Sequence, residues 1–309
     1  MQTLLGANGT VARELSLALA AYTPHVRQVS RQPRKVNVRD ETLVADLLDA
    51  TATARAVAGS QVVYLVAGLT YSTLAWQAQW PRVMRNVINA CKQHHASLVF
   101  LDNVYAYGRV HGVMTEATPF NPVSKKGEVR AQISRMLLDE IQANNLPAMI
   151  VRAADFYGPG AANSFVHSVV FERLRAGKSP QWLGNPMALH SFSFTPDMGR
   201  AMATLGQSRA AYGQTWHLPT SHEALTSENF VRLACSLARQ PFKLQVAPRW
   251  MAKMMGFFIP TMRENEEMMY QLLHDYRFES SKIEAAFGLR ATPYPDGVGA
   301  TLAATVKMQ

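Results

Sequence analysis

The sequence lacks the features of a membrane-inserted or exported chain. No apolar run approaches the roughly 20 residues that a membrane-spanning helix requires. The first residues also lack the basic, then apolar, then small-residue pattern of a signal peptide. We therefore expect no membrane partner and a cytoplasmic location.

Cysteine is nearly absent, with only Cys91 and Cys235 in 309 residues. The two lie far apart in stretches that resemble helices, and neither has a second cysteine or a histidine at metal-ligand spacing. Buried free thiols are the expected outcome. Among the nine histidines, His94 and His95 are adjacent, but neighbours on a helix point in different directions. The sequence therefore predicts no metal site.

Acidic residues are few, 22 against 31 lysines and arginines, which gives a formal net charge of +9. A basic surface concentrates polyanions, so nucleic acid is one class of partner to consider. The cations are scattered, however, and no nucleic-acid recognition motif is present. The densest group, Arg31, Arg34 and Lys35, lies where a dinucleotide phosphate would need it. We expect an anionic small ligand and no nucleic acid.

Residues 2 to 150 alternate short apolar runs with amphipathic stretches, which is typical of strands and helices around a parallel sheet. Near-continuous apolar runs fit short parallel strands that are covered on both faces. The predicted strands are Gln2–Leu5, Val26–Val29, Val62–Val66, Leu98–Leu101 and Ala148–Val151, with a short additional strand pattern before Ala45. The predicted helices are Val11–Ala21, Val83–Lys92 and Gly127–Asn144.

The second half of the chain, from about residue 155, has loops with Gly and Pro, short helices and a Met-rich segment. We expect an α/β fold, a Rossmann-type doubly wound parallel sheet over residues 1–154 with a smaller C-terminal substrate-binding lobe over 155–309. Phe192–Thr195 and Thr215–Leu218 resemble further strands that could return to the first sheet or pair near it, so some segments at about 190–220 would return to the first domain. Trp250–Pro260 could form a flexible lid, the surface of a homodimer or, ranked last, an interfacial membrane helix.

The first predicted strand leads into Gly6-Ala7-Asn8-Gly9-Thr10-Val11-Ala12 and then a helix. Glycines allow a tight turn and close approach to a pyrophosphate, whose charge is stabilised by the free N–H groups of the helix N-terminus. Ala12 replaces the last glycine of such patterns and still permits close packing. The turn predicts a dinucleotide site contacted by Gly6, Asn8, Gly9, Thr10 and Val11; an ordinary glycine turn is the alternative.

The residue after the second strand decides between NAD and NADP, because it meets the adenosine ribose. The run from Ser30 to Lys35 has no carboxylate, and Arg31 and Arg34 could grip a 2′-phosphate. We predict NADP, with NAD as the remaining option, and Arg31 as the best single candidate. The alternative is a basic loop that faces solvent.

Two further stretches fit the same site. Asp46 and Leu47 follow the short strand pattern, with Asp46 near the adenine amino group, and Ala67 and Gly68 end a strand with little side-chain bulk. A helix N-cap at Asp46 and a strand-to-loop turn at Gly68 are equal alternatives.

The order of the motifs resembles the extended and atypical short-chain dehydrogenase/reductase family, the NAD(P)-dependent epimerases and dehydratases, nearly from end to end. Four segments are similar to family elements: Asp102–Gly108 to Ser-Ser-x-x-Val-Tyr-Gly, Arg152–Gly160 to Arg-x-x-x-x-Tyr-Gly-Pro-Gly, Phe194–Ala201 to Val-x-Asp-x-Ala-x-Ala, and Tyr276–Ile283 to an Asp-Ser-Ser-Lys-like element. The resemblance implies coenzyme contacts at Ala153 and Ala154. It also implies a small-molecule substrate, and sugar nucleotides are common among relatives.

The catalytic positions depart from the family, whose members use a Ser or Thr and a Tyr-x-x-x-Lys pair. The resemblance places Asn103 at the Ser position and Lys126 and Arg130 at the Tyr and Lys positions, and the chain has no Tyr-x-x-x-Lys. Arg130 could bind the nicotinamide ribose but stays protonated. Lys126 could do acid–base work if its pKa is depressed, or Tyr105 or Tyr107 could supply a phenol. Alternatively, the two cations are only coenzyme ligands or surface charges.

Several aromatic residues are expected in loops beside the nicotinamide, which favours an apolar or ring-shaped substrate, although for any single one of them a place in the core is the stronger expectation. They are Trp76, Trp80, Phe156, Tyr157, Phe165 and Trp182. We predict an NADP-dependent oxidoreductase or epimerase-like enzyme that acts on a small carbonyl or alcohol by a nonstandard mechanism. The alternative is a sensor that binds the coenzyme and has lost the chemistry.

Overall fold

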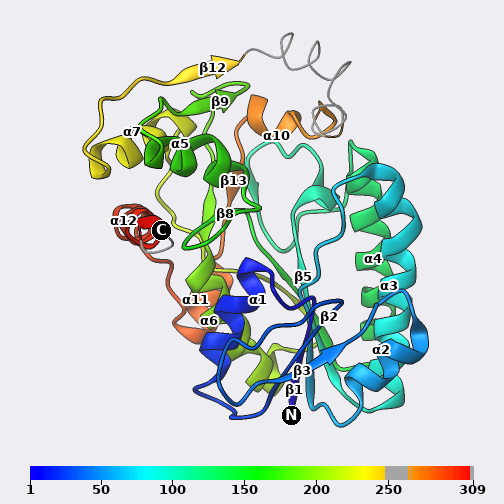
Figure 1. Ribbon diagram of the computed structural model, residues 1–309. Coiled ribbons are helices and arrows are strands. Elements are labelled where there is room, and N and C mark those ends of the chain that lie inside the picture. Colours follow the sequence, from blue (N-terminus) through cyan, green and yellow to red (C-terminus); the bar gives the residue numbers. More distant parts are fainter. Residues whose placement is uncertain (248–263, 265, 307–309) are drawn as a thin grey trace.

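A seven-stranded parallel sheet forms the centre of the molecule (Figure 1). The computed structural model describes residues 1–247, 264 and 266–306, and orders the strands β11-β7-β5-β4-β1-β2-β3, every neighbouring pair parallel. The strands are β1 (Gln2–Leu5), β2 (Val26–Ser30), β3 (Glu41–Val44), β4 (Val62–Leu65), β5 (Ser97–Asp102), β7 (Ala148–Arg152) and β11 (Thr215–His217). The fold class predicted from the sequence is confirmed.

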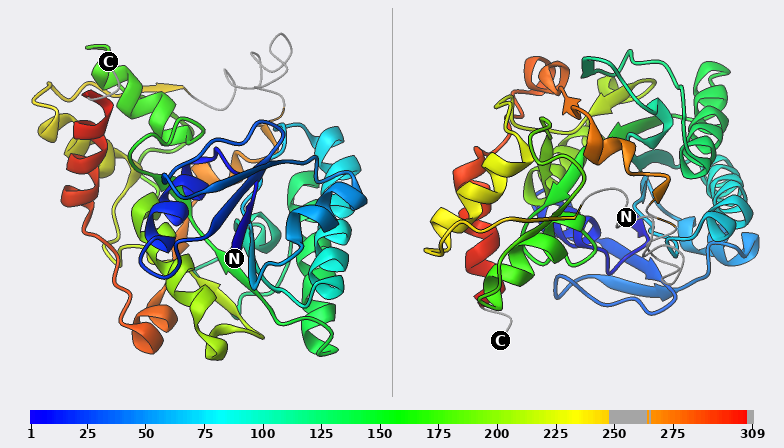
Figure 2. Two further views of the ribbon diagram at one scale, coloured as in Figure 1. Left: turned by 60° about the horizontal axis from the view of Figure 1, so that its bottom comes forward. Right: turned by 90° about the horizontal axis from the view of Figure 1, so that it is seen from above.

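Helices cover both faces of this sheet, which explains why its strands are apolar throughout (Figure 2). Successive residues of a strand point to opposite faces. Leu5 therefore packs with the first group of helices, and Leu4 with the second. The first group is α2 (Ala50–Val57), α3 (Thr73–Gln93) and α4 (Lys125–Gln142); the second is α1 (Thr10–Leu19), α6 (Thr195–Gln207) and α11 (Ser281–Phe287).

The strand order reverses at β1, which lies between β2 and β4. Ligands of such sheets bind outside the carboxyl ends of the strands at this switch point. The two backbone segments that follow β1 and β4 approach closely there, since a β-carbon added to Gly6 would lie 2.2 Å from the Cα of Ala67. The fold thus places the glycine turn at the position where a ligand is expected.

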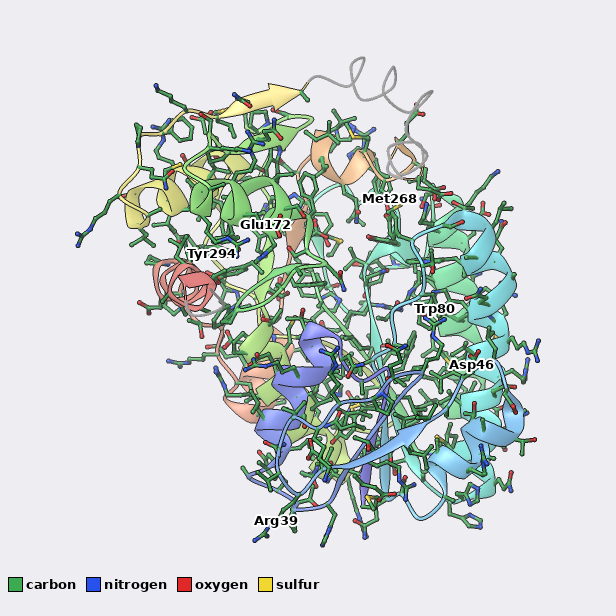
Figure 3. The ribbon with its side chains drawn as sticks, viewed as in Figure 1. Arg39, Asp46, Trp80, Glu172, Met268 and Tyr294 are labelled. Atoms are coloured by element: carbon green, nitrogen blue, oxygen red, sulfur yellow. The ribbon has the colours of Figure 1, made fainter. Side chains whose placement is uncertain are left out.

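Smaller sheets and short helices make up the C-terminal lobe, at the top of Figure 1, opposite the end at which β1 begins. The paired strands are β8 (Asp155–Tyr157) with β10 (Phe192–Phe194), β9 (Gln181–Leu183) with β12 (Gln245–Ala247), and β6 (Val113–Met114) with β13 (Arg277–Phe278). The helical elements outside the main sheet's two layers are η1 (Tyr105–Tyr107), η2 (His167–Phe171), α5 (Glu172–Arg175), η3 (Arg209–Ala211), α7 (Ser227–Leu237), α10 (Tyr270–Leu273) and α12 (Tyr294–Val306). Tyr294, marked in Figure 3, belongs to the aromatic core of this lobe.

The predicted start of the helix Val83–Lys92 is wrong. Helix α3 begins at Thr73, ten residues before Val83, and contains Pro81. Proline removes one backbone hydrogen bond from a helix interior. The loss is offset because Trp76 and Trp80, expected in loops, lie on α3 and bury their rings against the sheet.

Other expectations are corrected in the second half of the chain. Of the two strands expected in or near the first sheet, Phe192–Phe194 pairs with β8 outside the main sheet, and Thr215–His217 forms an edge strand of the main sheet. Tyr157 and Trp182 lie on strands and belong to the core of the lobe instead of lining a cleft from loops. Phe165 packs edge-on against Trp182, with ring centroids 5.3 Å apart.

Cys91 and Cys235 are buried and free, as expected. Within the described ranges, no group of three or more His, Cys, Asp or Glu side chains is arranged to hold a metal ion. No helix in those ranges is long and apolar enough to cross a membrane. The segment Trp250–Pro260 lies outside the described residues.

Candidate coenzyme site and active site

One large cavity, of about 1210 Å³, follows the carboxyl ends of the central strands. Its wall comes from the turn after β1, the loops after β2 to β5 and β7, and one face of α3. Most residues that the sequence pointed to are in this wall, namely Gly6, Asn8, Gly9, Thr10, Val11, Arg31, Asp46, Leu47, Ala67, Gly68, Asn103, Tyr105, Arg130, Ala153 and Ala154. Three of the coenzyme-binding and catalytic candidates are not, namely Arg34, Tyr107 and Lys126.

The glycine turn presents backbone N–H groups to one end of the cavity. Gly6 has φ +100°, and Gly9 is the N-cap of α1, with extended backbone and no side-chain cap. The first turn of α1 carries no acidic residue. Free N–H groups and the positive end of the helix dipole favour an anion at this place. These residues fit the diphosphate of a dinucleotide.

The adenosine end of the cavity is formed by the loops after β2 and β3. Arg31 is exposed and lies in the wall. The Asp46 carboxylate accepts the Leu48 N–H at 3.0 Å and so closes the turn after β3. The N-cap of α2 is Asp49, whose side chain accepts the Ala52 N–H, so the N-cap alternative for Asp46 is wrong. Asp46 lies on the same side of the molecule as Trp80, which belongs to α3 (Figure 3).

Aromatic rings surround the opposite end of the cavity. The rings of Trp76 and Tyr105 are stacked with centroids 6.2 Å apart, and Tyr71 meets Trp76 edge-on at 5.6 Å. Trp80 and Phe156 are also in the wall. Asn103 accepts the Tyr105 N–H at 3.0 Å through its amide oxygen, so its amide nitrogen is the group that it can offer to a ligand.

The phenols of Tyr105 and Tyr71 are hydrogen bonded to each other. Burial, with the nearby Tyr71 and Asp155 as smaller causes, raises the pKa of Tyr105 well above 10. Burial likewise raises the pKa of Tyr71 to about 12. Near neutral pH both are therefore neutral phenols, which can donate a proton but cannot act as bases.

Arg130, at the family's lysine position, is held by a buried carboxylate. Its Nε lies 2.7 Å from Oδ1 of Asp102 and its guanidinium lies 4.7 Å from the ring centre of Trp80. Arg152 and Ser134 bind the other oxygen of Asp102 at 3.1 Å and 2.8 Å. Burial alone would raise the pKa of Asp102, but the two guanidiniums outweigh it and hold that pKa below the usual range.

A buried chain of hydrogen bonds continues from Arg152. Its Nη1 donates to the Tyr107 hydroxyl at 2.9 Å, which lies 2.9 Å from Nε2 of His217. Nδ1 of His217 lies 2.6 Å from the Glu279 carbonyl oxygen, so Nδ1 carries the proton and Nε2 accepts from Tyr107. Tyr107 is thereby committed to the core, which leaves Tyr105 as the phenol in the cavity wall. The sequence contains no local signal for this role of His217.

His217 predicts a loss of stability in mild acid. Burial, reinforced by the cations of Arg152 and Lys282, lowers its pKa from 6.5 to about 3 despite the bond to Glu279. As the pH falls below about 6.5, the unfolded chain therefore takes up a proton at this histidine while the folded chain does not. The free energy of unfolding then falls by about 1.4 kcal/mol per pH unit. The free energy of unfolding, measured with urea at pH 7 and pH 5, should differ less in His217→Gln than in the wild type. An equal difference in both proteins would contradict this assignment, and exposed His25→Gln is the control.

Lys126, at the family's tyrosine position, is fully buried and is not part of the cavity wall. Its ammonium binds the Glu264 carboxylate at 2.5 Å, the Glu267 carboxylate at 2.8 Å and the Thr73 hydroxyl at 3.0 Å. Burial raises the pKa of Glu264, but hydrogen bonds from Lys126 and Thr73 outweigh it, and the net shift is downward. With its donors occupied, Lys126 fastens the segment before α10 to α4. Lys126 therefore lacks the free ammonium that acid–base work, one of the two roles considered for it, would need.

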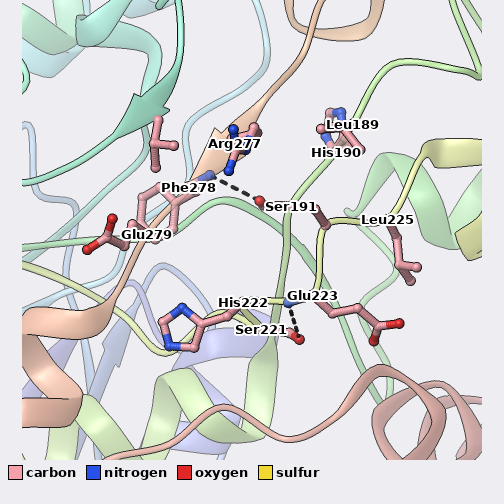
Figure 4. Close-up of a pocket in the computed structure, with 12 residues that line it drawn as sticks. Leu189, His190, Ser191, Ser221, His222, Glu223, Leu225, Arg277, Phe278 and Glu279 are labelled. Carbon is pink, nitrogen blue, oxygen red and sulfur yellow. Dashed lines mark hydrogen bonds between the residues drawn. The ribbon is translucent and has the colours of Figure 1, made fainter.

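A second, smaller pocket of about 130 Å³ lies in the C-terminal lobe (Figure 4). Ser191 accepts the Phe278 N–H, and Ser221 accepts the Glu223 N–H. His222 binds Glu284 at 3.1 Å. Most polar groups of this pocket are thus already hydrogen bonded or paired within the protein, and the glycine turn is not part of the pocket. The large cavity is therefore the candidate site.

Comparisons with known proteins agree with this fold. Solved structures match over almost the whole chain. A double mutant of DesIV, a dTDP-glucose 4,6-dehydratase from Streptomyces venezuelae with NAD bound, has a TM-score of 0.82, 15% identity and coverage of 99% of this chain and 97% of that chain. The UDP-glucuronic acid 4-epimerase of Bacillus cereus with NAD has a TM-score of 0.81 and 15% identity, and the match covers 100% of this chain and 99% of that chain. The UDP-glucose 4-epimerase of Thermus thermophilus with NAD has a TM-score of 0.80 and 17% identity, and the match covers 98% of each chain.

At these identities the structures show a shared fold. A search of curated proteins found no match. A family model, described as the NAD dependent epimerase/dehydratase family, matches residues 3–217, which is more than half of the chain and includes the glycine turn. The chain therefore belongs to the NAD dependent epimerase/dehydratase family.

Proposed function

We propose that the protein is an NADP-dependent oxidoreductase that reduces a carbonyl group on a small, sugar-derived substrate. The observation that carries this proposal is the continuous cavity, which runs from the glycine turn to Asn103 and Tyr105. One end can hold a diphosphate through backbone N–H groups, and the other has polar donors among aromatic rings. No other arrangement in the described part of the chain combines these two features.

The donors at the aromatic end favour reduction. When bound, the coenzyme would supply the hydride. The Asn103 amide can polarise the substrate carbonyl, and the neutral Tyr105 phenol can give its proton to the carbonyl oxygen as the carbon is reduced. The resulting phenolate regains a proton through Tyr71, which is 38% exposed and so reaches solvent. Arg130 and Lys126 take no part in proton transfer, since both are held by carboxylates.

The substrate class comes from the matched enzymes, which are named for dTDP- and UDP-sugars. The aromatic end of the cavity could stack a sugar or base ring. Nucleotide-linked ketosugars are therefore the first substrates to test.

The preference for NADP rests on the loop after β2. Its residues in the cavity wall are Ser30, Arg31 and Gln32, none of them acidic. A carboxylate there would bind the ribose hydroxyls of NAD and repel a 2′-phosphate, whereas a guanidinium can bind the phosphate. The three solved relatives described above hold NAD, so this chain would differ from them in its coenzyme.

A second function, a sensor that binds the coenzyme without chemistry, is favoured by one observation. Both cations at the family's catalytic positions, Lys126 and Arg130, are neutralised by carboxylates of the chain itself. A protein that no longer needs proton transfer can keep such internal pairs.

One experiment separates the two functions. Purified protein is incubated with NADPH and a panel of nucleotide-linked ketosugars and simple ketones, and coenzyme binding and oxidation are followed together. The oxidoreductase should oxidise NADPH with at least one member, and Tyr105→Phe should bind NADPH normally but react at least about 100-fold more slowly. Binding without oxidation throughout favours the sensor, and failure to bind either NADPH or NADH refutes both functions.

A further inference from the structure

The side chain of Asn8 connects the glycine turn to the loop after β2. Its amide nitrogen donates to the Gln32 carbonyl oxygen at 2.5 Å and lies 3.4 Å from the Ser30 hydroxyl. Its amide oxygen accepts the Arg34 N–H at 3.1 Å. One residue of the turn therefore binds the loop immediately before and after Arg31.

The other end of the same loop is fixed by a buried carboxylate. Asp40 is 2% exposed and accepts the N–H groups of Val36 and Asn37 at 3.0 Å and 2.9 Å. Its Oδ2 also accepts the Gln28 amide at 2.9 Å, which ties it to β2. A basic loop whose purpose was only solubility would not need two such anchors, so the arrangement favours a loop held in one shape.

The backbone at Asn8 explains why this residue type stands there. Its φ is +79°, in the left-handed region that glycine, asparagine and aspartate tolerate best. Glycine would satisfy the backbone equally well but would offer nothing to the loop. Aspartate would keep the acceptor for Arg34, but it would lose the donor to Gln32 and place a negative charge beside a bound phosphate.

We propose that Asn8 is a positioning residue for coenzyme choice, because it fixes the loop on both sides of Arg31 and so presents that guanidinium to the 2′-phosphate of NADP. Arg31 is exposed, lies in the cavity wall and has no carboxylate partner among the residues that the structure describes. Its charge is thus available to a ligand. This inference rests on the proposed function, specifically on binding of NADP.

The test is a double-mutant cycle with Asn8→Gly and Arg31→Ala, in which the dissociation constants of NADPH and NADH are measured by fluorescence titration. Asn8→Gly keeps the backbone and removes the side chain. It should weaken NADPH binding about 5- to 10-fold, the effect of about one lost hydrogen bond, and change NADH binding less than about 2-fold. Arg31→Ala should weaken NADPH binding about 10-fold or more. In the Arg31→Ala background, Asn8→Gly should have almost no further effect.

Asn144→Gly is the matched control, because Asn144 is also an exposed asparagine with positive φ, at +54°, but lies after α4, away from the cavity. Its affinities for both coenzymes should equal those of the wild type. Equal weakening of NADPH and NADH by Asn8→Gly would mean that Asn8 contacts the shared diphosphate, and would overturn the proposal. So would additive effects in the cycle. A wild-type protein with no preference for NADPH would instead refute the coenzyme assignment itself, and this is visible before any variant is made.

Discussion

Asp102→Asn should lower the free energy of unfolding by about 3–5 kcal/mol, because it leaves two buried guanidiniums without their carboxylate. Arg130 and Arg152 both bind Asp102, and all three side chains are at most 5% exposed. An amide can accept one of their hydrogen bonds but cannot compensate two positive charges on side chains that are this deeply buried. The measurement is urea unfolding followed by circular dichroism at neutral pH.

Ser134→Ala is the control for this prediction. It removes one hydrogen bond to the same carboxylate, 2.8 Å long, and leaves both ion pairs in place. Its cost should be about 1 kcal/mol. A loss below about 1 kcal/mol in Asp102→Asn would show that water reaches the guanidiniums, contrary to their burial. The pKa of Asp102 is depressed, so its contribution is present above the pKa of the unfolded chain and is lost only as the pH falls through the lower folded value.

The parts of the fold that could be predicted from the sequence are those whose cause is local. Each parallel strand shows as a short apolar run because both of its faces are buried, and the glycine turn shows because its residues are consecutive. The sequence predicts α3 too short because Pro81 interrupts the helical pattern, and the turns before Pro81 are stabilised by the burial of Trp76 and Trp80 against distant strands.

The candidate site likewise has parts that local sequence predicts and parts that depend on distant residues. Its coenzyme side is built from short segments at strand ends, and the sequence located most of that wall. The role of Lys126 could not be predicted, because its partners Glu264 and Glu267 lie 138 and 141 residues later in the chain. His217 is likewise 110 residues from Tyr107. A lysine at the position of a catalytic tyrosine is interpreted as an acid–base group until the carboxylates that bind it are known.

Substitution of the two glycines of the turn should separate folding from coenzyme binding. In Gly6→Ala, the new β-carbon would lie 2.2 Å from the Cα of Ala67, at a φ of +100° that alanine adopts with strain. Backbone cannot yield as a flexible side chain does. We expect a loss of about 2–5 kcal/mol in the free energy of unfolding, together with loss of coenzyme binding.

Gly9→Ala should keep the stability of the wild type and lose only coenzyme binding. Gly9 has φ −72°, and an added β-carbon would meet only the Gly6 carbonyl oxygen, at an ordinary 3.8 Å. The free energy of unfolding should stay within about 0.5 kcal/mol of the wild type. The methyl group would, however, stand where a diphosphate approaches the N-terminus of α1, so NADPH and NADH should both bind at least about 10-fold more weakly. Calorimetric titration of the two variants and thermal unfolding of each measure both effects. If Gly9→Ala binds both coenzymes as the wild type does, the diphosphate does not lie against this turn.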